Sequence, residues 1–255
     1  MIAAGIDIGS ITAKAALVED DRVLAVHTIF TGYNPAAAAR QVYARLLSRI
    51  GIRETAVRAV VATGYGRASV DFAHKTLTEI ICHGAGACFL NPGIRGVIDV
   101  GGQDSKAILL DAGGQVENFA MNDKCAAGTG RFLEVMARAL QVPLDRMGEI
   151  SLTADHPVNI SATCTVFAES EVISMIARQK NRQDIAAGIH RSAAARVASL
   201  AALIQLAPPV VMTGGVALNK GMVTAVADCL GYEIRVGRFP QENGAVGAAI
   251  LAARI

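Results

Sequence analysis

The chain contains an internal repeat. Residues 6–17 are IDIGSITAKAAL and residues 98–109 are IDVGGQDSKAIL, and six of the twelve aligned positions are identical. Each copy begins in an apolar, β-rich run, turns at a glycine and continues as a second strand that carries a lysine. A further strand-like run follows each copy, at Arg22–Ile29 and at Gln115–Met121. The repeat therefore predicts two similar three-stranded meanders.

Helical periodicity follows each meander, which predicts an α/β fold of two similar lobes. We expect the first lobe to comprise residues 1–92 and the second to comprise residues 93–244, with a last helix at 245–253 that packs back onto the first lobe. The predicted helices are Pro35–Ile50, about Lys75–Phe89, Thr129–Leu140, about Val166–Arg178, Arg182–Leu206, one from about Leu218, and Ala245–Ala253. The remaining predicted strands are Val57–Ala62, Val210–Thr213 and one near Glu233–Val236.

The composition fits a globular chain and excludes several classes of partner. Hydrophobic residues make up 52% of the 255 residues and charged residues 18%, and the formal net charge is only +2. Such a small charge gives no argument for nucleic acid or a membrane surface as a partner. No apolar run is long enough to span a membrane, and residues 1–8 lack the basic start of a signal peptide. We therefore expect a cytoplasmic protein whose five cysteines are reduced thiols or metal ligands.

The glycine turn in each repeat predicts a phosphate-binding loop. The first turn directly follows Asp7 and the second directly follows Asp99, and such turns point backbone N–H groups at phosphate oxygens. Asp7 and Asp99 together could hold Mg²⁺ through its water shell, because hard cations prefer oxygen ligands. A strand followed by a turn is the alternative interpretation of one copy alone, and the repetition argues against it. The candidate phosphate-binding residues are Gly9, Ser10, Thr12, Ala13, Lys14, Gly101, Gly102, Gln103 and Lys106.

A third glycine element completes a nucleotide-binding pattern. Residues 210–217, VVMTGGVA, form an apolar strand that ends in two glycines before a helix, so that Gly214, Gly215 and Val216 can approach a nucleotide closely. With loops at 7–14 and 99–106 and this motif at 213–219, the chain resembles the actin–hexokinase–acetate kinase superfamily. The resemblance implies ATP or ADP bound in a cleft between two lobes. It does not choose between a kinase, a chaperone and a filament protein.

Two cysteines lie in segments of small residues that lead into predicted helices. Cys125 lies at or just before the helix that begins near Gly128 and Thr129, which are themselves candidate cofactor-binding residues, and Cys164 precedes the next helix. Free N–H groups and the dipole at a helix N-terminus favour a thiolate or an anionic cluster. A 4Fe–4S cluster takes four thiolates, so two cysteines from each of two chains would suffice. The alternative for any single cysteine is a small packed side chain, and we assign Cys82, Cys88 and Cys229 to that class.

The two cysteine motifs, NDKCAAGTGRF (122–132) and ATCTVFAESEVIS (162–174), are similar to those of the activator ATPases of 2-hydroxyacyl-CoA dehydratases. The ATPase subunits of benzoyl-CoA reductase belong to the same family. VIDVGGQDSKAI (97–108), TGYGR (63–67) and MTGGVALNKG (212–221) also match. The resemblance implies a homodimer with one bridging 4Fe–4S cluster on Cys125 and Cys164 of both subunits. Such a protein passes electrons from ferredoxin or flavodoxin to a partner iron–sulfur dehydratase or reductase. One departure is Ile11, where these loops commonly carry Ser or Thr.

Further roles follow from the superfamily layout alone. Gln103 is the candidate for orienting the attacking water, beside Asp7 and Asp99 as the catalytic carboxylates. Glu169 (or Ser170) is expected near the ribose, and Asn219 near the adenosine. Arg67 and Lys124 either dock a partner or form surface salt bridges. Two other functions stay open at this point: a small-molecule kinase of the same superfamily, and a non-catalytic, nucleotide-gated assembly protein.

Overall fold

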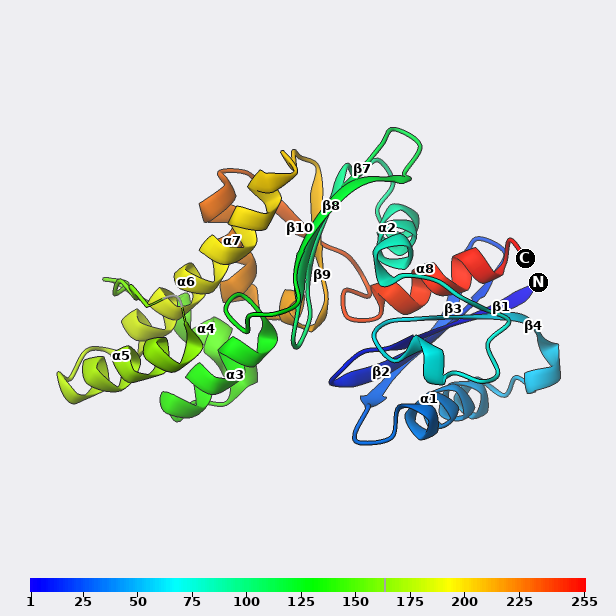
Figure 1. The fold of residues 1–255 in the computed structure, drawn as a ribbon, viewed down its shortest axis with the longest axis horizontal. Coiled ribbons are helices and arrows are strands. Elements are labelled where there is room, and N and C mark those ends of the chain that lie inside the picture. Colours follow the sequence, from blue (N-terminus) through cyan, green and yellow to red (C-terminus); the bar gives the residue numbers. More distant parts are fainter. Residues whose placement is uncertain (163) are drawn as a thin grey trace. The chain divides into compact units, whose positions relative to one another are not determined.

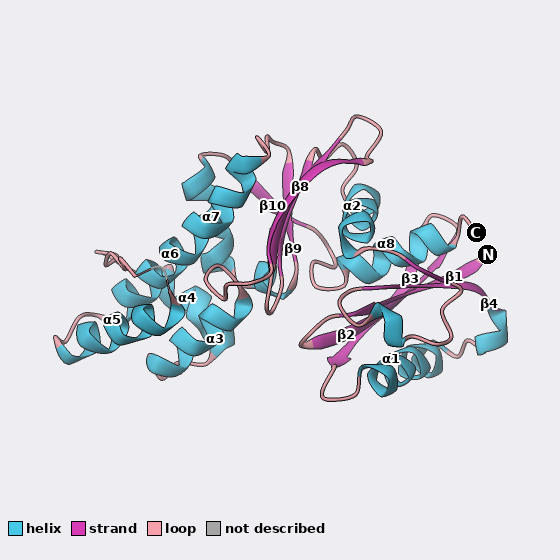
Figure 2. Ribbon diagram, in the orientation of Figure 1, coloured by secondary structure: helices cyan, strands magenta, loops and turns pink. Residues whose placement is uncertain are grey.

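The computed structural model describes residues 1–162 and 164–255, so Thr163, within the second cysteine motif, lies outside the described residues. The chain forms two compact units, each built on a five-stranded sheet with helices packed against it (Figures 1 and 2). Unit 1 comprises Met1–Ile94, Leu110–Glu117 and Gly237–Ile255, and unit 2 comprises Arg95–Leu109 and Asn118–Val236. None of the described helices has the length and apolar character that a membrane span requires.

The sheet of unit 1 has the strand order β3-β2-β1-β4-β5. The first three strands form an antiparallel meander, and β4 runs parallel to β1. Asn34 caps helix α1 (Pro35–Ile50), because its side chain accepts a hydrogen bond from the N–H of Ala37, and Gly51 ends the helix in the left-handed conformation. The strands are β1 (Ile2–Ile8), β2 (Thr12–Glu19), β3 (Arg22–Phe30), β4 (Val57–Thr63) and β5 (Lys75–Thr76).

Helices cover both faces of this sheet (Figure 1). Ile6 and Ile8 of β1 pack with α1 on one face, whereas Ala3 packs with helix α8 (Asn243–Ala252) on the other. Gly5 lets α8 lie directly on β1, since a Cβ at this position would collide with the carbonyl oxygen of Ala245. Helix α2 (Glu79–Leu90) packs against α8 through further glycines. Small residues therefore set the short distance between these elements.

The sheet of unit 2 has the strand order β10-β9-β6-β7-β8. The central strand β6 pairs antiparallel with β7 and parallel with β9. Its helices share one large core, in which Phe132, Leu133 and Met136 of α3 are fully buried. The strands are β6 (Gly96–Val100), β7 (Ser105–Leu110), β8 (Val116–Asn122), β9 (Val210–Thr213) and β10 (Ile234–Val236). The helices are α3 (Gly130–Ala139), α4 (Met147–Ser151), α5 (Thr165–Ala177), α6 (Arg182–Leu203) and α7 (Lys220–Leu230).

A buried histidine joins α6 to the start of α7. The side-chain oxygen of Asn219 accepts from the N–H of Met222, so its amide nitrogen donates to Nε2 of His190 at 3.0 Å. This arrangement assigns the imidazole proton to Nδ1, which is buried without a hydrogen-bond partner among the described residues. Burial lowers the pKa of His190 from 6.5 to about 4. The contact therefore requires a neutral imidazole.

The α/β fold with two meanders is confirmed, and most predicted elements are present. Helix α1 and strand β9 have the predicted limits, and the other helix and strand limits differ by a few residues. The prediction that a helix begins near Lys75 is wrong. Lys75 and Thr76 form the edge strand β5, which pairs with Val61 and Ala62, and the helix begins only at Glu79. The short helix α4 was not predicted.

The His190 contact predicts that the folded state loses stability in weak acid. Between pH 6.5 and 4 the unfolded chain takes up a proton that the folded chain excludes, so stability falls as the pH falls, by up to about 1.4 kcal/mol per pH unit. From pH 7 to pH 5 the loss is about 2 kcal/mol. Urea unfolding at both pH values should show that His190→Gln loses about 2 kcal/mol less than the wild type. His156→Gln, at an exposed histidine, is the control and should behave like the wild type.

Candidate functional site

The loop of the first repeat is a tight hairpin at the end of β1. The strand register places Asp7 opposite Lys14, and the Lys14 Nζ lies 3.1 Å from a carboxylate oxygen of Asp7, which is buried. The N–H of Gly9 donates to the carbonyl of Thr12 at 3.0 Å, and the hydroxyl of Thr31 donates to the carbonyl of Gly9 at 2.8 Å. The turn therefore holds a fixed shape around a carboxylate–ammonium pair.

The second repeat forms the same pair in unit 2. Asp99 lies opposite Lys106, whose Nζ is 3.2 Å from one oxygen of Asp99 and 2.7 Å from Asp104. The hydroxyl of Thr213, at the end of β9, donates to the other oxygen of Asp99 at 2.9 Å. Neither Asp104 nor Thr213 is among the residues predicted from the sequence. Asp104 has no acidic counterpart in the first repeat, where Thr12 occupies the equivalent position.

A further, shorter repeat in the sequence could have identified Thr213. Residues 60–64 are VVATG and residues 210–214 are VVMTG. In unit 1, Thr63 pairs with Asp7 across parallel strands, and in unit 2, Thr213 pairs in the same way with Asp99. Each unit therefore presents an aspartate, a lysine and a Thr-Gly turn in one arrangement.

The glycine of each Thr-Gly turn is required by its backbone and by its neighbours. Gly64 has φ 86° and Gly214 has φ 85°, values that favour glycine strongly. A Cβ at Gly64 would collide with the Asp7 carboxylate, and a Cβ at Gly214 would lie 3.0 Å from the Asp99 carboxylate and collide with the Val100 carbonyl. Both turns therefore hold the backbone close to a buried carboxylate.

The remaining predicted nucleotide residues have varied surroundings. Ser10 and Gln103 are exposed at the two loop tips, whereas the side chain of Ala13 is buried in the core. Gly215 begins a 3-10 helical turn, and its neighbour Val216 is buried. The side chain of Asn219 caps α7 and contacts His190, and Glu169 lies half-buried on α5. Their contacts to a nucleotide, and the joint magnesium site of Asp7 and Asp99, stay predictions.

The first cysteine lies in a loop between β8 and α3. Cys125 is exposed, and α3 begins five residues later, at Gly130, one residue after the predicted helix start at Thr129. The tight turn Ala126–Thr129 separates the two, with Gly128 at φ 83° and the Thr129 hydroxyl donating to the Ala126 carbonyl.

The start of α3 is hydrogen-bonded to the predicted phosphate loop of its own unit. The N–H groups of Gly130 and Arg131 donate to the carbonyls of Gly101 and Gly102, at 2.9 and 2.8 Å. These first N–H groups of the helix have no partner within it, so the loop satisfies them. Two hydrogen bonds therefore connect the second predicted phosphate loop to the helix that follows Cys125.

The second cysteine is the N-cap residue of α5 and is exposed. Glu171, two turns further along the same helix, holds the chain that approaches Cys164, because its carboxylate accepts from the backbone N–H groups of Ser161 and Ala162. Desolvation raises the pKa of Glu171, but these hydrogen bonds outweigh it and hold the pKa below its usual range. The sequence analysis did not identify Glu171, although the cysteine motif contains it.

The other three cysteines differ in their surroundings. Cys82 is buried in α2, where desolvation raises its thiol pKa to about 12, and Cys88 is half-buried. Both fit the expectation of packed side chains. Cys229 is exposed on α7, which contradicts that expectation. Among residues 1–162 and 164–255, no group of three or more His, Cys, Asp or Glu side chains is placed to hold a metal ion.

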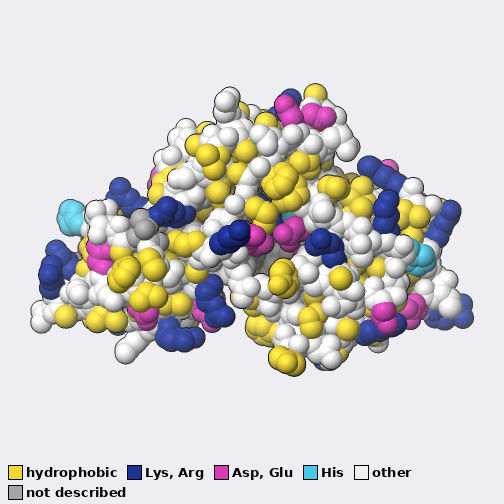
Figure 3. Space-filling view, viewed as in Figure 1, with side chains coloured by type: hydrophobic (Ala, Val, Ile, Leu, Met, Phe, Trp, Pro, Cys, Tyr) yellow, Lys and Arg dark blue, Asp and Glu magenta, His cyan; other side chains and the backbone are white. Residues whose placement is uncertain are grey.

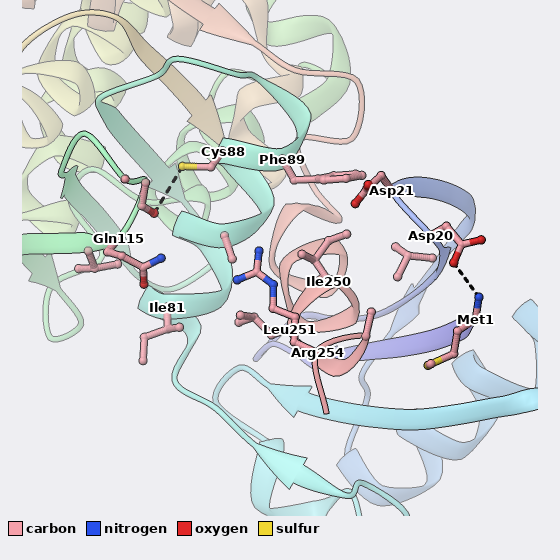
Figure 4. Close-up of a pocket in the computed structure, with 16 residues that line it drawn as sticks. Met1, Asp20, Asp21, Ile81, Cys88, Phe89, Gln115, Ile250, Leu251 and Arg254 are labelled. Atoms are coloured by element: carbon pink, nitrogen blue, oxygen red, sulfur yellow. Dashed lines mark hydrogen bonds and ion pairs between the residues drawn. The ribbon is translucent and has the colours of Figure 1, made fainter.

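A cavity of about 690 Å³ lies in unit 1 (Figure 4). Ile81 and Cys88 of α2, Ile250 of α8, Gln115 and Arg254 contribute to its lining. None of the predicted phosphate or adenosine residues lines this cavity, and neither does Cys125 or Cys164. It is therefore not the predicted nucleotide site.

An apolar face of α5 is exposed to solvent. Val166, Phe167 and Ile173 are 65%, 67% and 55% exposed, and Val166 and Ile173 share a face because they are two helical turns apart. Figure 3 shows hydrophobic side chains gathered over the part of unit 2 where α5 lies, at the lower left. Large exposed apolar patches of this kind mark interaction surfaces.

Proteins of known function match the whole chain. The model of the BadF/BadG/BcrA/BcrD ATPase family matches residues 4–252. A 2-hydroxyisocaproyl-CoA dehydratase activator from Clostridioides difficile is 45% identical over 253 residues, covering 99% of this chain and 95% of that protein. The (R)-2-hydroxyglutaryl-CoA dehydratase activating ATPase of Acidaminococcus fermentans is 44% identical over 250 residues, covering 97% and 95%.

Solved structures agree with these matches. The activator of 2-hydroxyisocaproyl-CoA dehydratase from Clostridium difficile with bound ADPNP matches with a TM-score of 0.94 at 45% identity, covering 99% of this chain and 94% of that one. A ROK family glucokinase from Streptomyces griseus, with a TM-score of 0.60 at 17% identity over the full length of both chains, shares the fold alone. The resemblance predicted from the motifs is thus confirmed, and the chain belongs to the BadF/BadG/BcrA/BcrD ATPase family.

Proposed function

We propose that this protein is an ATP-hydrolysing activator that delivers low-potential electrons to a partner iron–sulfur dehydratase or reductase. The observation that carries the proposal is the pair of backbone hydrogen bonds that joins the Gly101–Gly102 loop to the N-terminus of α3 in unit 2. A conformational change of this loop can therefore be transmitted through α3 to the segment that carries the exposed Cys125. The relatives described above are named as dehydratase activators, which supports this function.

The paired loops supply the ATP-binding part of the function. Lys14 and Lys106 are the cations for the phosphates, and the buried carboxylates of Asp7 and Asp99 are the candidates for the water shell of Mg²⁺. Hydrolysis converts ATP and water into ADP and phosphate, and the exposed Gln103 is placed at a loop tip where it can orient that water. A relative crystallised with bound ADPNP supports nucleotide binding by this fold.

The cysteines supply the redox part. Cys125 and Cys164 are both exposed and both lie on unit 2, so their thiols are accessible to a second copy of the chain. Two chains then provide the four thiolates that a 4Fe–4S cluster takes. When bound, such a cluster stores and releases one electron at low potential. Cys164 is the N-cap residue of α5, and the N–H groups at a helix N-terminus favour a bound anionic group such as a cluster.

A homodimer follows from the same count of thiols and from the exposed face of α5. The apolar side chains of this face lie on the helix that Cys164 caps. A second copy related by two-fold symmetry would cover both faces and bring the cysteines of both chains together. Ferredoxin or flavodoxin is the proposed source of the electron, and we propose a cytoplasmic location.

Coupling requires that ATP and ADP favour different conformations of the chain. The loop carbonyls of Gly101 and Gly102 are fixed to α3, so a shift of the loop on phosphate binding moves the start of the helix with it. ATP hydrolysis then makes electron delivery directional, because the conformation that accepts an electron differs from the one that releases it.

A small-molecule kinase is the second candidate that the fold allows. The likeness to a glucokinase, at 17% identity, extends to the fold alone. A kinase has no use for two exposed cysteines in segments that dedicated side chains hold in place. The cysteines therefore favour the activator.

The second phosphate loop predicts a loss of ATP hydrolysis without loss of iron. Asp99→Asn removes a buried charge next to Lys106, and we expect the ATPase rate to fall by about a hundredfold or more. The iron content should stay at the wild-type level, because Asp99 is no thiol ligand. The measurements are phosphate release and iron per chain, with Asp228→Asn, an exposed site on α7, as the control. ATPase activity retained in a folded Asp99→Asn protein would contradict the loop assignment.

The cysteine assignment predicts which thiols bind iron. Anaerobically purified protein should be brown, with about four iron atoms per two chains. Cys125→Ala and Cys164→Ala should each be colourless, whereas Cys229→Ala, at an exposed cysteine of the same unit, should keep its iron. Absorption spectra and iron analysis measure this. Colourless wild-type protein from an oxygen-free preparation would refute the cluster.

The α5 face predicts that one charge makes the protein monomeric. Phe167→Glu places a carboxylate on the proposed apolar contact, which costs desolvation energy on association. Light scattering should then report the mass of one chain instead of two. Leu203→Glu, an equally exposed apolar residue at the end of α6, is the control and should stay dimeric. A dimeric Phe167→Glu protein would place the interface elsewhere.

A further inference from the structure

One side chain holds the backbone that leads into Cys164. The Glu171 carboxylate accepts from the N–H of Ser161 at 3.0 and 3.1 Å, from the N–H of Ala162 at 3.0 Å and from the hydroxyl of Ser161 at 3.2 and 3.3 Å. Glu171 lies two helical turns beyond Cys164 on α5. Its side chain therefore ties the incoming chain to the helix that Cys164 caps.

The chemistry of this contact depends on the negative charge. A carboxylate only accepts hydrogen bonds, and three donors point at it. Hydrogen bonds to an ionised group are stronger than those between neutral groups. A glutamine in its place would turn one acceptor oxygen into an NH₂ group, which would face an N–H donor. The contact is thus specific to an acidic residue of this length.

A different side chain holds the other cysteine. The Asn122 oxygen accepts from the N–H of Cys125 at 3.1 Å, while its amide nitrogen donates to the carbonyls of Cys125 and Ala127 at 2.7 and 3.2 Å. The amide therefore binds both the N–H and the C=O of the cysteine. An aspartate at this position would keep the acceptor and lose both donors.

The contacts of Glu171 and Asn122 fix the backbone of the two cysteine segments and do not involve the thiol groups. Cys125 and Cys164 are exposed, and among the described residues neither thiol takes part in these hydrogen bonds. Fixing the backbone of a loop in advance removes an entropy cost from any later binding step. A metal centre shared by two chains gains most from such preparation, because each chain must present its thiols before the other arrives.

We propose that Glu171 and Asn122 are positioning residues that hold Cys164 and Cys125 in the conformation that receives the cluster. The proposal rests on the cluster described under the proposed function. Neither residue touches the metal, and each acts through the backbone of its cysteine segment. Loss of either contact should therefore loosen the thiols and weaken the hold on iron, with nucleotide binding unchanged.

The experiment compares Glu171→Gln and Asn122→Asp with two matched controls. Glu149→Gln removes an exposed carboxylate on α4, and Asn118→Asp changes an exposed asparagine of β8, the strand that ends at Asn122. In iron-free protein, amide hydrogen exchange at residues 161–162 should be about tenfold faster in Glu171→Gln, and exchange at Cys125 about tenfold faster in Asn122→Asp. Both controls should stay within about twofold of the wild type.

The second readout uses the protein loaded with iron. The rate at which a chelator removes iron should rise about tenfold in each test variant and stay unchanged in the controls. The electron paramagnetic resonance spectrum of the reduced protein should broaden or shift, since the thiolates adopt more than one geometry. Thermal unfolding of the iron-free variants checks folding. Wild-type exchange and wild-type chelation rates in folded Glu171→Gln and Asn122→Asp would overturn the proposal.

The two readouts separate this proposal from the cluster itself. If the wild-type protein takes up no iron, the cluster proposal fails. The hydrogen exchange of the iron-free protein still shows whether Glu171 and Asn122 hold the segments. If the wild type binds iron and the exchange rates change but chelation does not, the residues are structural only, and the positioning role is wrong.

Discussion

The pairing of a buried aspartate with a lysine on the neighbouring strand is the interaction on which the nucleotide loops depend. Asp7 with Lys14 and Asp99 with Lys106 place opposite charges next to each other in a largely buried setting. A buried charge without a partner is costly, so each lysine has only one acceptable strand register. A slip by one residue would turn the lysine to the other face of the sheet. The pairs thus fix the turn between the strands and the glycines in it.

The cysteine segments extend this fixed geometry in unit 2. The turn that follows Asp99 offers its carbonyls to the first N–H groups of α3, and the loop before α3 carries Cys125. Two hydrogen bonds thus join the parts of the chain assigned to ATP and to electron transfer. Because those N–H groups are already bonded within the protein, they are not available to an anion, and the contribution of a helix N-terminus falls to α5 at Cys164.

The sequence predicted the parts of the site that repeat or that lie next to glycine. The meanders, the aspartate and lysine of each repeat and the Gly214 turn all leave a local pattern in the chain, whereas the contact between each aspartate and its lysine is seen only in the structure. Thr213 leaves a pattern too, but the match between VVATG and VVMTG becomes meaningful only when both strands are seen beside an aspartate. Glu171 and Asp104 leave none, because their roles depend on a hydrogen bond that only the folded backbone creates. Lys75 and Thr76 were misassigned because pairing to β4 overrides a helical pattern at a sheet edge.

The additional carboxylate beside Lys106, that of Asp104, gives the loops of the two repeats different formal charges. In unit 1, the carboxylate of Asp7 faces the ammonium group of Lys14, so this pair is formally neutral. In unit 2, Asp99 and Asp104 share a single lysine, which leaves one formal negative charge. The excess negative charge at Asp99 and Asp104 attracts a divalent cation more strongly than the Asp7–Lys14 pair does. The neutral Asp7–Lys14 pair repels an anionic phosphate less than the loop of unit 2 does. Asp104, which has no acidic counterpart in the first repeat, therefore gives the two loops of a repeated sequence different formal charges.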